Sequence, residues 1–155
     1  MDTLTSVNKS IVAREVRDFI LAVEDKIRTV PGATYGDNVA PLKHTFVDGA
    51  YVREIFMHKG LLLTSKIHKV THPYFILQGE VTVVTEEGEI NIKAPFYGVT
   101  KAGTKRLIYV REDTVWVTVH VTKERDLKLI EEEIIANNFE ELDNIIDIKE
   151  EKCLE

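Results

Sequence analysis

Apolar side chains recur at helical spacing near the N-terminus. Between Ile11 and Ile27 they lie three or four positions apart, and charged side chains fill most of the other positions. This 3.6-residue period is typical of an amphipathic helix that buries one face. Pro31 and Gly32 end the pattern, because proline lacks the backbone N–H and glycine favours turns. We therefore predict a helix over residues 8–29.

The pattern changes to short β-prone runs after a stretch rich in turn formers. Residues 32–49 contain several turn-forming pairs and predict a connecting loop. The predicted strands that follow are Tyr51–Phe56, Leu62–His68, Tyr74–Gln78, Glu80–Thr85, Glu89–Lys93, Phe96–Val99, Arg106–Val110 and Val115–Val121. Turns are expected at Gly60, Gly79, Gly88 and Gly103. About eight short strands indicate a mainly β fold, either an antiparallel sandwich or a barrel.

Helical spacing returns after Asp126, with apolar side chains at Leu127, Ile130 and Ile134. Asn138, with Glu141 three positions later, resembles a capping box that opens a second short helix. We expect a C-terminal helical segment over residues 123–148 and a frayed acidic tail over residues 149–155. Residues 1–155 are expected to form a single domain, with the barrel over about residues 45–122.

The composition narrows the class of protein. Of the 155 residues, 44% are hydrophobic and 30% are charged, which is typical of globular proteins. No apolar run approaches the roughly 20 residues that cross a bilayer, and no secretory leader is recognisable, so we expect no membrane association and a cytoplasmic location. Cys153 is the single cysteine, which excludes an intrachain disulfide and fits a reducing compartment.

The net charge of −6 is concentrated in the C-terminal part, after Lys123. Nucleic-acid binding depends on clustered lysine and arginine side chains, and the sequence has no such cluster. Nucleic acid is therefore not an expected partner. The acidic C-terminal helix remains a candidate surface for a protein partner.

Two histidines four residues apart, His68 and His72, lie at the start of an apolar run. Residues two apart in an extended strand face the same side, so Lys66, His68 and, if the strand continues, His72 point into one space. Neutral imidazole is a suitable ligand for zinc, manganese, iron or nickel. His68 and His72 are therefore candidate metal ligands. The alternative is a pair of partly buried histidines hydrogen-bonded to backbone or water.

The run Val115–Val121 alternates with a period of two: every odd position is valine, and the even positions are Trp116, Thr118 and His120. A valine face is expected to pack, so the mixed face is expected to line the barrel cavity or a subunit interface. His120 is then a third metal donor or a general base, and so the candidate catalytic residue. It can also be a histidine capped by a neighbouring hydroxyl. Trp116, Thr118 and Tyr74 are candidate ligand-binding residues.

The order Gly60, Lys66-Ile-His68, His72, Gly79 resembles the first motif of the cupin superfamily. That motif is a glycine, a His-x-His pair, a glutamate four residues after the second histidine, and a glycine seven residues further on. Lys66 stands in place of the first histidine, and His68 matches the second. His72 stands in place of the glutamate, and Gly79 matches the last glycine.

The second cupin motif, Pro-x-Gly-x-x-His, is similar to the segment Lys101–Arg106, in which Arg106 replaces the final histidine. The resemblance covers about residues 50–122. It implies a cupin-type antiparallel β-barrel, or jelly roll, to which this chain adds an N-terminal helix and C-terminal helices. The whole layout also resembles small stand-alone cupin-like proteins of tailed phages.

Metal-dependent cupins hold their metal with three histidines and a glutamate, so the resemblance implies a divalent metal. This chain departs from that pattern, because Lys66 and Arg106 are cations at neutral pH. Two cations beside a divalent metal are electrostatically unfavourable. They are instead candidates for binding a phosphate or a carboxylate.

Three functions are compatible with these residues. The first is a binding module whose pocket captures a small polar or anionic metabolite, such as a nucleotide-like or sugar-like molecule, with or without a metal. The second is a metal-dependent isomerase, lyase or oxygenase. The third is an interaction module that acts through the acidic C-terminal helix. A homodimer is expected, because both terminal helices need an apolar partner surface.

Overall fold

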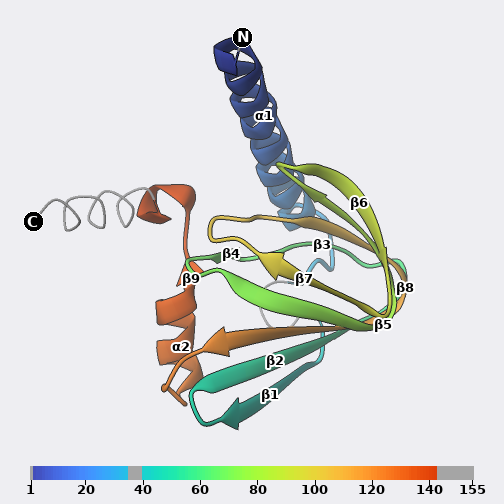
Figure 1. Ribbon diagram of the computed structural model, residues 1–155. Helices are drawn as coiled ribbons and strands as arrows, with labels where there is room; N and C mark the ends of the chain where they lie inside the picture. The colour runs from blue at the N-terminus through green and yellow to red at the C-terminus, as the bar shows by residue number, and fades with distance from the viewer. Residues whose placement is uncertain (1, 35–39, 143–155) are drawn as a thin grey trace, which may run out of the picture.

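The computed structural model describes residues 2–34 and 40–142 (Figure 1). Its elements, in chain order, are α1 (Asp2–Arg28), β1 (Leu42–Val47), β2 (Ala50–Met57), β3 (Leu62–Thr64), β4 (Ile67–His68), β5 (His72–Thr85), β6 (Gly88–Lys93), β7 (Phe96–Thr100), β8 (Leu107–Val121), α2 (Leu127–Ile134) and β9 (Ile135–Ala136). A further helical turn covers residues 139–142.

The strands pair antiparallel throughout the main sheet. Hydrogen-bonded neighbours follow the order β1-β2-β8-β5-β6, β3 also pairs with β8, and β7 also pairs with β5. The two longest strands, β5 and β8, have different outer partners along their lengths: β7 then β6 for β5, and β3 then β2 for β8. They therefore connect two packed halves around a common interior (Figure 1). The expected mainly β, antiparallel fold with an N-terminal helix and C-terminal helices is confirmed.

Gly79 lies inside β5, so the predicted turn at this position is wrong. The register between β5 and β8 shifts on both sides of Gly79, which marks a β-bulge that bends the strand without ending its pairing. Its φ of +89° favours glycine, and an added Cβ would meet the Asp113 carbonyl oxygen at 2.3 Å. The strands predicted over 74–78 and 80–85 are therefore one strand.

Three other strand predictions need correction. Val115–Val121 and all but the first residue of Arg106–Val110 belong to one strand, β8, which continues through the exposed residues 111–113. Leu62–His68 divides into β3 and β4, because β3 pairs with β8 whereas β4 pairs with β9. The predicted loop contains β1, whose alternating burial was hidden by the turn formers around it.

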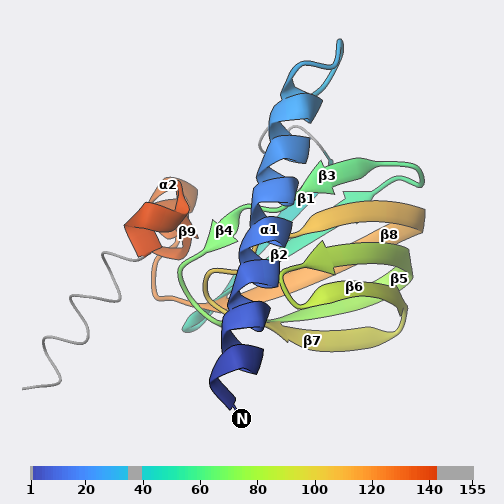
Figure 2. The same ribbon diagram turned by 90° about the horizontal axis from the view of Figure 1, so that it is seen from above.

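Helix α1 begins at Asp2, six residues before the predicted start, and ends one residue early at Arg28. Ile20 is a fully buried side chain of this helix. The Glu24 carboxylate accepts hydrogen bonds from Thr64 Oγ1 at 2.6 Å and Lys105 Nζ at 2.9 Å. These contacts fix the C-terminal half of α1 beside β3, while its N-terminal end projects past the sheet (Figures 1 and 2).

Helix α2 stands at the barrel end where β8 ends (Figure 1). Asp126 caps it by accepting hydrogen bonds from two backbone N–H groups, and Ile130 and Ile134 pack on Tyr51. Strand β9 follows directly, so the helical segment predicted over 123–148 is interrupted. Asn138 caps the next helical turn as predicted. Residues 143–148, the tail over 149–155 and Cys153 lie outside the described residues.

The barrel core is formed by side chains from several strands, and its fully buried members include Ile76, Val81 and Val110. No helix within the described ranges has the length and apolar character needed to cross a membrane.

Candidate functional site

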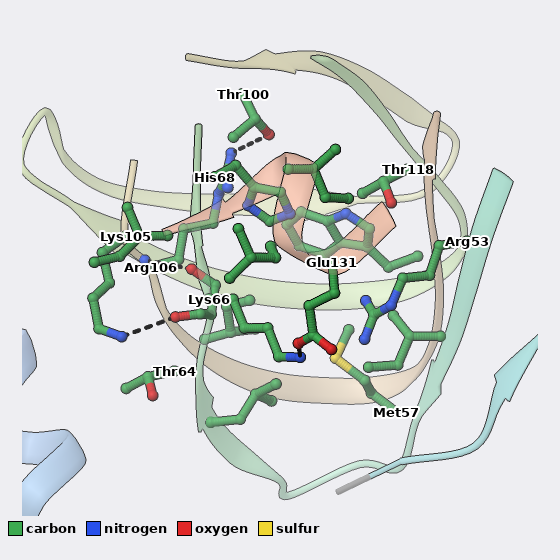
Figure 3. A pocket seen from close by; sticks show the side chains of 18 of the residues that line it. Arg53, Met57, Thr64, Lys66, His68, Thr100, Lys105, Arg106, Thr118 and Glu131 are labelled. Atoms are coloured by element: carbon green, nitrogen blue, oxygen red, sulfur yellow. Dashed lines mark hydrogen bonds and ion pairs between the residues drawn. The ribbon is translucent and has the colours of Figure 1, made fainter. Parts of the chain in front are cut away.

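A cavity of about 780 Å³ opens between the barrel strands, α2 and the C-terminal end of α1 (Figure 3). Side chains of β2 and β8 form much of its wall. On these two strands, alternate residues face inward, and β8 lines the cavity with Ile108, Trp116, Thr118 and His120. The expectation that this mixed face lines the cavity agrees with the structure. The valine face points away from the cavity. Val117 is buried there but Val121 is 88% exposed, so the expectation that this face packs holds only in part.

Three histidines from three separate strands meet at one end of the cavity. His68 lies in β4, His72 begins β5, and His120 lies near the end of β8. One ring nitrogen from each lies within 4.8 Å of the others. The ring centroid of His72 lies 4.4 Å from that of His68 and 4.3 Å from that of His120. The fold therefore brings His120 to the two histidines of the sequence motif, and the three form one cluster.

Local contacts orient the ring of His72. Its Nδ1 lies 2.9 Å from the Val70 carbonyl oxygen, which can only accept, so Nδ1 carries the hydrogen. Its Nε2 therefore presents a lone pair. This atom is buried and has no hydrogen-bond partner among the described residues. A backbone carbonyl that fixes one imidazole nitrogen while the other stays free is the arrangement found around metal-binding histidines.

His68 and His120 complete the set of donors. His68 Nδ1 is also buried without a hydrogen-bond partner in the described part of the chain. His120 Nε2 lies 3.2 Å from Thr118 Oγ1, the hydroxyl cap considered from the sequence. Buried polar atoms are almost always hydrogen-bonded, so two orphaned imidazole nitrogens in one cluster indicate a missing partner. Three neutral imidazoles fit a divalent transition metal.

Burial keeps all three rings neutral near pH 7. Burial, with repulsion from His72 and His120, lowers the pKa of His68 to about 2. Burial and the neighbouring His72 lower the pKa of His120 to about 4. The pKa of His72 is lowered mainly by burial as well. Because a metal binds the unprotonated ring, no proton has to be displaced at neutral pH.

Arg106 brings a buried positive charge beside this cluster. It is 7% exposed, its Nη2 donates to Thr100 Oγ1 at 2.8 Å, and it also hydrogen-bonds the Tyr74 side chain. None of the described carboxylates forms an ion pair with it, although buried charges are normally paired. Burial lowers the pKa of Arg106. The positive charge of Arg106 also contributes to the lowered pKa of His68 and of His72 by charge repulsion. The site therefore carries an uncompensated cation that suits an anionic ligand.

Lys66, the other cation in the motif, lines the more exposed side of the cavity. Its Nζ forms an ion pair with the Glu131 carboxylate of α2 (Figure 3). The neighbouring Lys105 is 5% exposed and is held by Glu24 and by the Ser65 carbonyl oxygen. Both lysines therefore have a carboxylate partner. Arg106 is the better candidate for holding an anion.

The remaining sequence candidates differ in their positions. Trp116 and Thr118 line the cavity, whereas Tyr74 lies behind it, stacked on Trp116 at 4.8 Å. Sequence reasoning missed Arg53 and Thr100, which also line the cavity. The alternation within β2 could have identified Arg53, because it shares the inward face with Tyr51. Thr100 gave no sequence signal, because only the pairing of β7 with β5 places it beside His72.

No protein-family model matches this chain, and no curated protein matches it. Among solved structures, it is similar to a protein of unknown function from Vibrio parahaemolyticus, with 11% identity over 56% of this chain and 92% of that chain and a TM-score of 0.48.

Other similar structures include cupin-domain proteins. A cupin superfamily protein from Desulfitobacterium hafniense is 13% identical over 57% of this chain and 82% of that chain, with a TM-score of 0.46. An uncharacterized protein with a double-stranded β-helix domain from Klebsiella pneumoniae is 14% identical over 60% of this chain and 80% of that chain, with a TM-score of 0.48. Such distant similarity carries no argument about the activity or ligand of this chain.

Proposed function

We propose that this chain is a small-molecule-binding protein that holds a divalent metal on His68, His72 and His120 and captures an anionic metabolite beside it. The observation that carries the proposal is the cluster itself, with ligand atoms within 4.8 Å of one another and two buried nitrogens without partners. A metal bound there would act as a Lewis acid toward an oxygen of the ligand.

Arg106 supplies the second contact to the ligand. A guanidinium offers five N–H donors in a planar fork and binds carboxylate or phosphate in a two-pronged manner. Thr100 and Tyr74 hold the Arg106 side chain at the cavity wall, which reduces the entropy lost when an anion binds. An anion would also compensate the buried charge. Both effects support an anionic ligand over a neutral one.

A metal-dependent enzyme is the second candidate, and the number of donors favours it. Structural zinc sites usually have four protein ligands, whereas catalytic sites have three and leave a position open. The cluster in the described residues has three. An isomerase, lyase or oxygenase would use that open position to bind its substrate. If His68 and His72 alone held the metal, His120, whose Nε2 lies 3.2 Å from the Thr118 hydroxyl, would instead be the candidate acid or base.

An interaction module that acts through α2 has less support. The apolar face of α2 packs on Tyr51, and two of its glutamates contact the barrel: Glu131 pairs with Lys66, and Glu133 accepts a hydrogen bond from Thr122. These contacts support a role for α2 as a wall of the cavity.

The metal content of purified variants tests the proposal. Protein incubated with equimolar zinc, manganese, iron and nickel and then desalted should retain one metal ion per chain. The His68→Ala, His72→Ala double variant should retain almost none. His58→Ala is the matched control, because that side chain is 74% exposed and lies outside the cluster. Equal metal retention by the double variant and the control would refute the site.

A further inference from the structure

The inward-facing side chains change from polar to apolar along the barrel axis. Strand pairing places the cavity-lining residues of β2 opposite residues of β8: Tyr51 with His120, Arg53 with Thr118, Ile55 with Trp116, and Met57 with Thr114. Successive pairs lie about 7 Å apart, at about 3.3 Å per residue. The imidazole end is thus followed by a pair with a cation and a hydroxyl, and then by a largely apolar region.

Figure 3 shows His68 and Thr100 on one side of the cavity and Met57 on the opposite side, where the charged side chains of Lys66 and Glu131 also appear. The distance from the Arg53 pair to the Met57 pair is about 13 Å along the strand, at about 3.3 Å per residue. A small molecule can therefore place different groups at the two ends.

The apolar end has a continuous wall from three strands and the loop before β3. Six apolar side chains line it: Ile55, Met57, Leu61, Leu63, Ile108 and Trp116. Ile55, Leu61 and Leu63 are only partly buried, although they pack against the barrel core. Their remaining surface faces the cavity. An apolar group placed against this wall would be stabilised by its removal from water.

We propose that the natural ligand is an amphipathic carboxylate, with its anionic head between the histidine cluster and Arg106 and an extended apolar body along this wall. The inference rests on the proposed function, since the same residues bind the head group. The apolar wall makes a sugar-like or nucleotide-like ligand unfavourable. Hydroxyl groups placed against the wall would lose their hydrogen bonds to water without gaining others.

A series of linear carboxylates tests this inference on the full-length, zinc-loaded protein. Trp116 is the single tryptophan, is 6% exposed and belongs to the apolar wall, so its fluorescence reports binding. We expect Kd to fall from butanoate through hexanoate to octanoate, by roughly fourfold for each added methylene that is buried. 1-Octanol and glucose 6-phosphate are the comparison probes, and both should bind more weakly than octanoate.

Two variants separate the contributions of the head and the body. Arg106→Gln should weaken all three carboxylates by the same factor. Ile55→Thr, which keeps a β-branched side chain in the strand, should weaken octanoate more than butanoate and so reduce the preference for octanoate. Metal content serves as the folding control for both variants.

The outcomes distinguish the two proposals. Binding of all carboxylates with equal Kd would overturn the apolar-body inference and leave the anion site intact. Octanol binding as tightly as octanoate, or glucose 6-phosphate binding more tightly, would also overturn it. If no carboxylate binds to protein that holds its metal, the anionic-ligand part of the proposed function fails, and this inference fails with it.

Discussion

The histidine cluster, in which His72 and His120 are buried and His68 is partly buried, should make the metal-free protein less stable in mild acid. Burial lowers the pKa of His120 to about 4, whereas a histidine in the unfolded chain titrates near 6.5. Between these values the unfolded chain binds a proton that the folded chain excludes. The free energy of unfolding therefore falls as the pH falls from about 6.5 toward 4.

The size of the effect follows from the two pKa values. For His120 alone, lowering the pH from 7 to 5 should reduce the free energy of unfolding by about 2 kcal/mol. His68, whose pKa is about 2, adds a loss of the same order over this range. The window ends at pH 5 because exposed carboxylates begin to titrate below it.

Urea unfolding at pH 7, 6 and 5 in the presence of a chelator measures this loss. His120→Asn should flatten the pH dependence by about 2 kcal/mol over the window, because the titrating group is removed. His58→Asn should leave it unchanged, since His58 is exposed. A free energy of unfolding that is constant from pH 7 to pH 5 in the wild-type protein would refute the buried, neutral cluster. An equal slope in His120→Asn would refute the role of His120.

Two further predictions concern the barrel. Gly79→Ala should destabilise the protein by several kcal/mol more than Gly60→Ala in urea unfolding, since both glycines have similar positive φ values but an added Cβ meets the β8 backbone only at Gly79. The homodimer expected from the sequence stays a prediction. Light scattering should give twice the mass of one chain. Val121→Lys, on the outer sheet face where Tyr97 is also exposed, should lower the measured mass toward that of one chain. A monomeric wild-type protein would contradict the homodimer prediction.

The local periods in the sequence predicted most elements of the fold but not their limits. The alternation in residues 115–121 correctly identified which face of β8 lines the cavity, but the valine face that was expected to pack is only partly buried, with Val121 88% exposed. It could not show that β5 continues through Gly79, because the bulge depends on contact with Asp113 and Thr114, which are distant in the sequence. The length of β8 was also missed, because the charged residues 111–113 interrupt the local β-prone pattern although the strand continues through them.

The site was predictable where its residues share a motif or a strand. His68 and His72 form a motif, and His120 was a candidate because it faces the cavity side of its strand. The closeness of His120 to the other two depends on the pairing of β5 with β8, which no local pattern contains. Lys66 and Arg106 were equivalent candidates in the sequence. Glu131 of α2 distinguishes them, because it forms an ion pair with Lys66, whereas none of the described carboxylates forms one with Arg106.

The most direct test of the account is the position of a metal in the barrel. Crystals of the full chain grown with zinc should give an anomalous difference peak bonded to one nitrogen each of His68, His72 and His120, at the about 2.0–2.1 Å typical of zinc–imidazole bonds. Ordered imidazoles at this position with no peak between them, or zinc bound only elsewhere on the protein, would contradict the central claim.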